Sequence, residues 1–378
     1  MTDTIYTKLA LHLDKLPGGF PATEEGVELR ILERLFTPAQ AEVACHLTLL
    51  HETPAVIALR VGWSEKRVAP LLAEMADRGL IFSKGESEGR PTYMAAQFAV
   101  GIWEYQVGHL TKGLAEEMER YLPHLLNHKT WGKAPQMRVV PVGRSVDARQ
   151  EILTHERAAA LLEDQEDFTV MPCICRKERG LLDKACDKPV ETCISFGGAG
   201  DYFQRTGAGR PASREEVLKL LHQADRAGLV LQPSNSRKAG WICCCCGCCC
   251  GVLRTLREAP QPARLVATPF VARMDTAACN GCGTCVRRCQ MDAFTKSADG
   301  GIDLDPDRCI GCGLCVSTCP TGALELVRKP KEAQPRVPAN VATSMLRLAW
   351  KRRQTGPAAL LGLVAASQRD RWRVKKKA

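Results

Sequence analysis

The sequence predicts a multidomain α+β protein, and three uneven distributions along its 378 residues lead to that prediction. Nineteen of the 20 cysteines lie between residues 173 and 319. Amphipathic helical patterns dominate residues 25–100 instead. The tail, residues 328–378, carries fourteen Lys or Arg against two acidic residues, a net charge of +12; the whole chain carries +10, so residues 1–327 carry about −2. We therefore expect a helical N-terminal part, a cysteine-rich middle and a basic C-terminal tail.

The composition is that of a globular protein, with 45% hydrophobic and 25% charged residues. No stretch approaches the 18 continuous apolar residues of a transmembrane helix. The N-terminus lacks the basic and apolar regions of a secretory signal. We therefore expect a cytoplasmic protein, in which thiols stay reduced and dense cysteine clusters bind metal.

A helix–turn–helix followed by a β-hairpin is expected in residues 25–100, after an N-terminal extension at 1–24. Ser64 is the expected N-cap of the last helix, and Gly79 its end. The expected segments are helices at 25–36, 39–50, 54–62 and 64–79 and a hairpin within 81–98. This order resembles the winged-helix family, of the kind seen in multiple-antibiotic-resistance-type repressors. A helical linker is expected at 101–134.

The charge of this N-terminal part does not favour DNA binding. Affinity for DNA rests on neutralisation of phosphates by Lys and Arg. From Val27 to Val100 there are eight Lys or Arg and nine Asp or Glu. We therefore expect a protein-docking or dimerising winged helix, with DNA binding as the alternative. Cys45 lies on an apolar stripe with Ala44 and Leu47 and is expected in the core.

Two copies of C-x2-C-x2-C-x3-C lie 30 residues apart within residues 270–327. They comprise Cys279, Cys282, Cys285 and Cys289, then Cys309, Cys312, Cys315 and Cys319. Four thiolates at this spacing suit a cubane [4Fe–4S] cluster. The interspersed glycines let the backbone curl tightly around it. Zinc also binds C-x2-C pairs, but it does not explain the repeated four-cysteine pattern.

This pattern resembles the bacterial dicluster ferredoxins over about residues 270–327. The resemblance implies two [4Fe–4S] clusters whose fourth ligands are exchanged between the motifs. One set would be Cys279, Cys282, Cys285 and Cys319, and the other Cys309, Cys312, Cys315 and Cys289. Gln290 stands where the first motif usually has proline, a departure that removes no ligand.

A small α/β domain is expected at residues 135–260, and it holds eleven further cysteines. They are Cys173, Cys175, Cys186, Cys193, Cys243, Cys244, Cys245, Cys246, Cys248, Cys249 and Cys250. Disulfides between adjacent cysteines are strained, so a subset of these thiols is expected to bind metal. A third iron–sulfur cluster is favoured, and zinc or a redox dithiol or persulfide relay are the alternatives.

The order of these cysteine segments has a counterpart elsewhere. A CxCR segment at 173–176 and a C-D-K-P-x-E-x-C segment at 186–193 precede the run at 243–250. This order resembles a Cys-rich region found upstream of ferredoxin repeats in anaerobic bacteria and archaea. The resemblance implies an iron–sulfur protein and an anaerobic metabolism, without specifying a reaction.

The rest of this domain shows conventional signals. Strands are expected at 137–142 and 168–173 around a helix at 156–164. A helix should begin at a capping box of Ser213 and Glu216, end near Gly228, and lead into a strand. The glycine-rich segments 197–202 and 207–210 are expected to be turns. His155 and His222 are expected to be ordinary surface residues.

The tail alternates apolar and basic segments and leaves three roles open. They are docking to an acidic redox partner, binding to acidic lipid at the inner membrane surface, and solvated disorder.

The expected function is multi-cluster electron transfer with a redox protein partner and no catalytic residue of its own. One alternative is a redox- or oxygen-sensing winged-helix regulator. The other is an iron–sulfur enzyme with an open iron in the 173–250 site.

Overall fold

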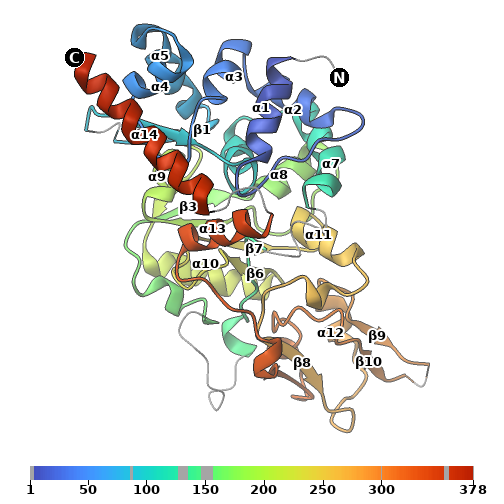
Figure 1. Cartoon of the computed structure of the whole chain (residues 1–378). Helices are drawn as coiled ribbons and strands as arrows, with labels where there is room; N and C mark the ends of the chain where they lie inside the picture. The colour runs from blue at the N-terminus through green and yellow to red at the C-terminus, as the bar shows by residue number, and fades with distance from the viewer. Residues whose placement is uncertain are drawn as a thin grey trace. The chain divides into compact units, whose positions relative to one another are not determined.

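The computed structural model describes residues 4–85, 88–126, 135–145, 156–298, 300–352 and 357–377. The chain divides into two compact units (Figure 1). The helical unit comprises Met1–Leu125 and Met345–Ala378, and the cysteine-rich unit comprises Leu126–Ser344. Together they have the mixed α/β character that the sequence predicts.

Helices and one hairpin build the N-terminal part of the helical unit. The elements are α1 (Ile5–Asp14), α2 (Val27–Leu35), α3 (Pro38–Ala44), α4 (Pro54–Val61), α5 (Glu65–Asp77), β1 (Ile81–Lys84), β2 (Thr92–Ala95), α6 (Trp103–Tyr105) and α7 (Lys112–Leu125). Ser64 occupies the N-cap position of α5, without a side-chain cap bond. The left-handed conformation of Gly62 ends α4, and that of Gly79 follows α5. The predicted order of helices and hairpin is therefore present.

The second predicted helix is shorter than expected. It begins at a capping box in which Thr37 and Gln40 bond each other's backbone, and it ends at Ala44 rather than residue 50. The residues beyond it pair with the hairpin instead. The Thr48 carbonyl accepts from Ala95 N–H, and Glu52 forms a β-bridge with Tyr93. Pairing with a strand removes these backbone groups from the helix. Cys45, just after the helix, is half-buried.

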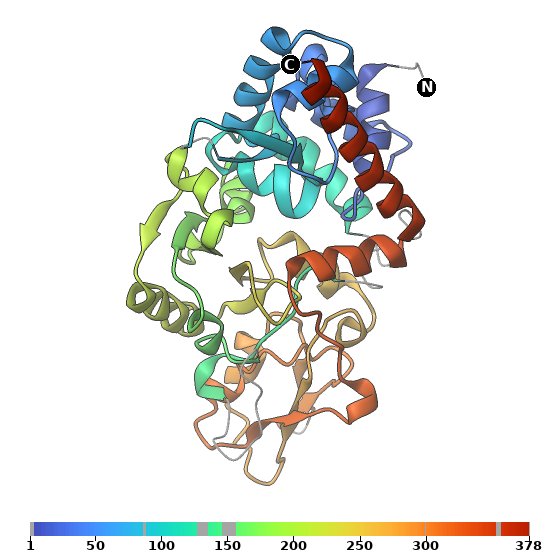
Figure 2. The same cartoon turned by 60° about the vertical axis from the view of Figure 1, so that its left-hand side comes forward.

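The C-terminal tail contains two helices after residue 340, α13 (Val341–Lys351) and α14 (Pro357–Lys377). Within the helical unit α14 contacts α4, and Figure 2 shows it running beside the N-terminal helices. Ser367 is 1% exposed and donates a hydrogen bond to Glu52 over 2.6 Å. Solvated disorder is therefore wrong for α14. None of the described helices is long and apolar enough to cross a membrane.

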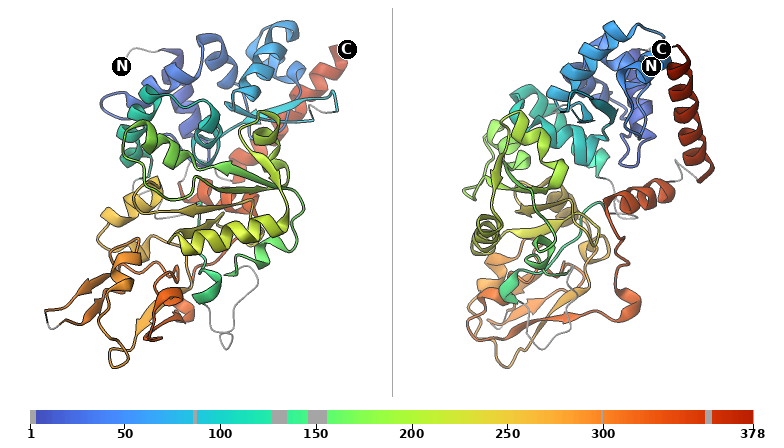
Figure 3. Two further views of the ribbon diagram at one scale, coloured as in Figure 1. Left: turned by 180° about the vertical axis from the view of Figure 1, so that it is seen from behind. Right: turned by 90° about the vertical axis from the view of Figure 1, so that its left-hand side faces the viewer.

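A five-stranded antiparallel sheet, in the order β5-β3-β4-β7-β6, organises the cysteine-rich unit. Its strands are β3 (Phe168–Pro172), β4 (Glu191–Phe196), β5 (Arg210–Ala212), β6 (Val230–Pro233) and β7 (Trp241–Cys245). The helices around it are α8 (Ile174–Leu181), α9 (Asp201–Arg205), α10 (Arg214–Arg226) and α11 (Gly251–Glu258). Helix α10 lies against β3, β4 and β6 (Figure 3).

Local signals explain α10. The Ser213 hydroxyl accepts a hydrogen bond from Glu216 N–H over 3.2 Å, and Gly228, with φ of 72°, follows the helix before β6. Val217, Leu221 and Ala224 form its buried stripe. The predictions of this helix, of the strand after it and of a strand at 168–173 are confirmed.

Two predicted elements in this unit are wrong. The helix expected at 156–164 is only a 3-10 turn, Ala160–Leu162, because so short a segment gains little from helix propagation and buries Leu161 and Leu162 directly. The strand expected at 137–142 is reduced to isolated bridges, since its residues pair alternately with 231–234 and with Ala267. His222 on α10 is exposed, and His155 lies outside the described residues.

The glycine-rich segments behave differently from one another. Residues 197–199 form a 3-10 turn that leads directly into α9, and Gly207 adopts a left-handed conformation in the turn before β5. Both therefore contain turns, as predicted.

Two short antiparallel sheets complete this unit. Strand β8 (Phe270–Met274) pairs with β11 (Leu324–Arg328), and β9 (Phe294–Lys296) pairs with β10 (Ile302–Leu304). The β8–β11 pair joins the beginning of the first cysteine motif to the end of the second. Helix α12 (Thr284–Arg288) contains the third cysteine of the first motif, and a 3-10 turn, Val316–Thr318, follows the third cysteine of the second.

Candidate functional site

Two cavities within residues 270–327 are each lined by four cysteines. The outer cavity is lined by Cys279, Cys282, Cys285 and Cys319. The inner cavity is lined by Cys289, Cys309, Cys312 and Cys315. Each cavity combines three cysteines of one motif with the last cysteine of the other. This grouping is the exchange that the ferredoxin resemblance implies.

The loops around the cavities need glycine for conformation and for space. Gly281, Gly283, Gly311 and Gly313 all have φ between 65° and 74°. A Cβ on Gly311 would lie 2.4 Å from the Phe270 carbonyl oxygen, and one on Gly281 would lie 2.7 Å from that of Gly300. Any side chain here would displace backbone, so the loops can close around a cofactor only with glycine.

The inner cavity also has the polarity that a cluster requires. Backbone N–H groups of Ala272 and Ala293 donate to the sulfurs of Cys309 and Cys289, each over 3.3 Å. Such donors stabilise thiolates and tune cluster potentials. Burial raises the pKa of the Cys312 and Cys315 thiols, so their thiolate forms need the compensating positive charge of a metal. The residues present therefore fit iron–sulfur clusters.

Exposure distinguishes the two cavities. Cys282 of the outer cavity is exposed. None of the inner cavity's four cysteines is exposed: Cys309 and Cys315 are buried, and Cys289 and Cys312 are half-buried. Cys289 and Cys312 of the inner cavity pack against the core that contains Cys244, Cys246 and Cys249. The inner cavity thus adjoins the middle cysteines.

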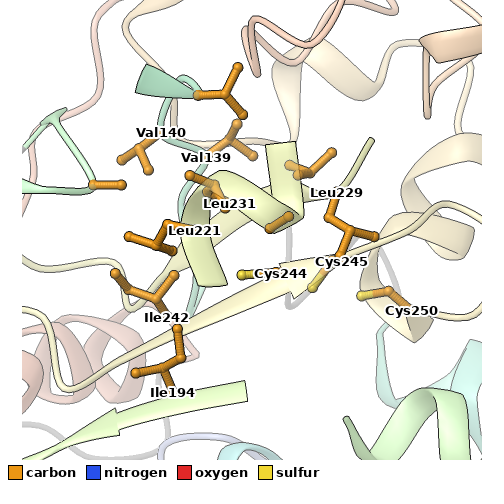
Figure 4. Packing of buried hydrophobic residues seen from close by; sticks show 14 of the residues in the cluster. Val139, Val140, Ile194, Leu221, Leu229, Leu231, Ile242, Cys244, Cys245 and Cys250 are labelled. Atoms are coloured by element: carbon orange, nitrogen blue, oxygen red, sulfur yellow. The ribbon is translucent and has the colours of Figure 1, made fainter. Parts of the chain in front are cut away.

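The alternation of side chains along β7 places its cysteines on two different faces of the sheet. Cys243 pairs in register with Cys193 of β4, and their sulfurs are 3.6 Å apart. Cys245 lies on the same side as Cys243, since side chains alternate along a strand. Cys244 continues the opposite side, after Ile242, and is 2% exposed in the apolar core (Figure 4). Cys244 is therefore placed as a core residue.

The other ten middle cysteines form two groups. The Cys186 quartet consists of Cys186, Cys246, Cys248 and Cys249, whose sulfurs all lie within 4.8 Å of one another. The six-thiol chain is a series of electrostatically interacting thiols in the order Cys173, Cys175, Cys250, Cys245, Cys243 and Cys193, and its last two sulfurs lie 3.6 Å apart. Figure 4 shows Cys245 and Cys250 close together, from β7 and the residue before α11.

Arg176 lies close to both groups, and the sequence reading gave it no role. Only 3% of it is exposed, and its guanidinium donates to the Thr192 hydroxyl and the Cys244 carbonyl. Burial opposes its charge, but the thiolates of Cys173 and Cys246 outweigh burial and raise the pKa of Arg176. Arg176 is therefore a buried cation beside both groups of thiols. The one feature of the sequence that could have indicated this role is the position of Arg176 directly after the C-x-C segment at 173–175.

Gln290, the departure from the ferredoxin motif, connects the inner cavity to the cysteine run. Its side-chain oxygen accepts a hydrogen bond from Gly247 N–H over 2.7 Å. A Cβ on Gly247 would lie 2.6 Å from the Gln290 carbonyl oxygen, so the two segments are in close contact. Proline has no side-chain acceptor and could not make this bond. The unusual residue at 290 thus serves this contact.

Gln290→Ala is expected to loosen this contact and to speed the release of iron to a chelator. The loss of this part-buried hydrogen bond leaves the buried Gly247 N–H unpaired, which costs about 1–3 kcal/mol, so release should accelerate on the order of tenfold. The matched control is Gln261→Ala, which removes an exposed hydrogen bond to Asp307. Equal release rates in the two variants, measured anaerobically by absorbance, would contradict this role of Gln290.

Comparison with known proteins identifies one part of the chain. Residues 272–326 match the family described as a 4Fe-4S dicluster domain. Searches of curated proteins and of solved structures found no match to the chain. The cysteine-rich unit therefore ends in a ferredoxin-like 4Fe–4S domain, as predicted for about 270–327.

Proposed function

We propose that the protein is an iron–sulfur electron carrier with two [4Fe–4S] clusters and a further metal or iron–sulfur site at 173–250. The observation that carries this proposal is the pair of cavities, each lined by four cysteines of the dicluster motif. Cys279, Cys282, Cys285 and Cys319 would hold one cluster, and Cys309, Cys312, Cys315 and Cys289 the other. When bound, such clusters supply reversible one-electron redox chemistry.

The chain's own residues give the two sites different tasks. At the outer cavity Cys282 is exposed, and the exposed side chains of Arg287 and Lys296 lie beside its loop. A basic rim favours encounter with an acidic partner. The inner cavity has no such exposure and adjoins the middle thiols. We therefore propose that a redox protein docks at the outer cavity and that the inner cavity connects it with the 173–250 site.

Metal analysis of the anaerobically purified full chain tests this proposal. Two clusters require about eight irons with an equal amount of acid-labile sulfide, and a third four-iron cluster would raise both to about twelve. About eight irons and no other metal would make the third-site prediction wrong. Fewer than eight sulfides, or clusters that a reductant and an oxidant do not cycle, would contradict the carrier function itself.

We propose that residues 25–100 form a winged helix and that this domain docks another protein. The support is the order α4, turn, α5 and hairpin β1–β2. Helix α5 exposes Glu65, Lys66 and Arg67, and the Arg67 guanidinium lies 3.6 Å above the Trp63 ring. This mixed charge suits a protein surface better than DNA phosphates. Sequence-dependent retardation of DNA by the full chain at physiological salt would contradict the proposal and support a regulator.

A further inference from the structure

The Cys186 quartet has the dimensions of a site for a single metal ion. Its sulfurs are 3.8 Å apart for Cys186 and Cys246, 3.6 Å for Cys186 and Cys249, and 3.9 Å for Cys248 and Cys249. An ion with tetrahedral metal–sulfur bonds of about 2.3 Å places its ligands about 3.8 Å apart. These three separations match four thiolates around one ion, and all four sulfurs lie within 4.8 Å of one another.

A cubane cluster requires a wider arrangement. Its four thiolates bind four different irons, so they occupy the corners of a larger tetrahedron. The ferredoxin cysteines of this chain surround cavities in that manner. Among the described residues, no other group of three or more Cys, His, Asp or Glu has its ligand atoms all within 4.8 Å of one another. One structure thus contains two kinds of four-cysteine site.

Local structure supplies the ligands from two segments. Cys246 and Cys249 form a C-x2-C pair in a tight turn, closed by a hydrogen bond from Cys250 N–H to the Cys246 carbonyl over 3.1 Å. Such turns present both thiolates to one ion. Cys186 comes from the loop after α8, 60 residues earlier. An ion would therefore cross-link that loop to the turn between β7 and α11.

The surroundings suit a negatively charged complex. Four thiolates around a divalent cation carry a net charge of about −2. The buried Arg176 cation interacts with Cys246, and Cys248 is exposed, so water screens the opposite side. The turn itself is fixed from outside by the hydrogen bond between Gly247 and Gln290.

We propose that Cys186, Cys246, Cys248 and Cys249 bind one thiophilic divalent cation, zinc or ferrous iron, without sulfide. This inference rests on the proposed function for the presence of a further metal at 173–250, and it specifies which thiols hold it and how many ions they hold. It leaves the six-thiol chain as the separate candidate for a third iron–sulfur cluster.

The test compares the full chain with the double variant Cys186→Ser/Cys249→Ser, both purified anaerobically. Zinc, iron and acid-labile sulfide are measured per chain. The expected result is the loss of one metal atom with sulfide unchanged. The control, Cys45→Ser, changes a half-buried thiol of the helical unit and should lose nothing. A parallel loss of several irons and sulfides would overturn the proposal, as would unchanged metal content.

A measurement on the wild-type chain keeps the inference testable if the variant fails to fold. If the chain contains zinc, X-ray absorption at the zinc edge should report four sulfurs at about 2.3 Å. If its iron instead exceeds its sulfide by one, Mössbauer spectroscopy should show one high-spin ferrous site besides the cluster irons. Bridging metal neighbours around zinc, or the absence of both zinc and excess iron, would overturn the inference. Intact iron and sulfide of the two ferredoxin clusters would show that the proposed carrier function had not failed with it.

Discussion

Cys315→Ser is expected to remove the inner cluster and to destabilise the dicluster domain around it, while the outer cluster stays bound. Cys315 lines the inner cavity, is 8% exposed and belongs to the small core formed with Phe294, Ile302 and Leu324. Binding of a structural metal contributes on the order of 10 kcal/mol to the folding of a small metal domain. Iron and sulfide should each fall by about four per chain, and the thermal transition of this domain should move to a lower temperature.

Two control variants separate the loss of a cluster ligand from the general effect of replacing a cysteine. Cys45→Ser should leave iron, sulfide and the thermal transition unchanged. Cys282→Ser changes an exposed cysteine of the outer cavity, so it should also lose about four irons. It should disturb the packing of the small core around Phe294, Ile302 and Leu324 less than Cys315→Ser does. Full retention of iron and sulfide in Cys315→Ser would show that this cysteine is not a cluster ligand.

Arg60→Ala is expected to destabilise the helical unit by about 3–5 kcal/mol and to release α14, because it leaves a buried carboxylate unpaired. The Glu52 side chain is fully buried, and Arg60 lies 2.8 Å from it and 3.1 Å from Asp370 of α14. Ser367 of α14 bonds the same carboxylate. Hydrogen exchange should show loss of protection along α14, and chemical unfolding should give the free-energy change.

The matched control for Arg60→Ala is Glu42→Ala, which breaks a half-exposed i,i+4 pair with His46 and should cost about 0.5 kcal/mol or less. Unchanged protection of α14 in Arg60→Ala would contradict the predicted role of this ion pair.

Acid should reproduce part of the Arg60→Ala effect. Burial opposes ionisation of Glu52, but hydrogen bonds from Arg60 and Ser367 outweigh it and hold the pKa of Glu52 below its ordinary value of 4.5. The stabilisation is therefore fully present above about pH 4.5 and is lost as the pH falls through the lower folded-state pKa. In Arg60→Ala this acid-dependent loss should shrink, which unfolding curves from pH 7 to pH 3 would measure.

The sequence was most informative where chemistry is set by local spacing. The repeated motif leads directly to two groups of four cysteines, because three of each group lie on one glycine-containing loop. The capping box at Ser213 and the glycine at 228 likewise define α10 through contacts within a few residues. A helix without such signals, at 156–164, was predicted incorrectly.

Contacts between distant residues could not be read in this way. The pairing of Cys193 with Cys243 depends on the register of β4 and β7, and Cys186 joins Cys246 and Cys249 across 60 and 63 residues. Helix α14 contacts α4 through an ion pair between residues 310 positions apart. Composition marks such segments as cysteine-rich or basic, but only tertiary packing assigns their partners.

A reductive titration of the anaerobically purified full chain, followed by EPR, tests the central claim most directly. That claim is that two neighbouring [4Fe–4S] clusters at residues 272–326 relay single electrons. The prediction is uptake of at least two electrons in single steps, with signals broadened by interaction between the two reduced clusters, and of one electron fewer in Cys315→Ser. Iron that takes up no electron reversibly, or the signal of one isolated cluster alone, would contradict it.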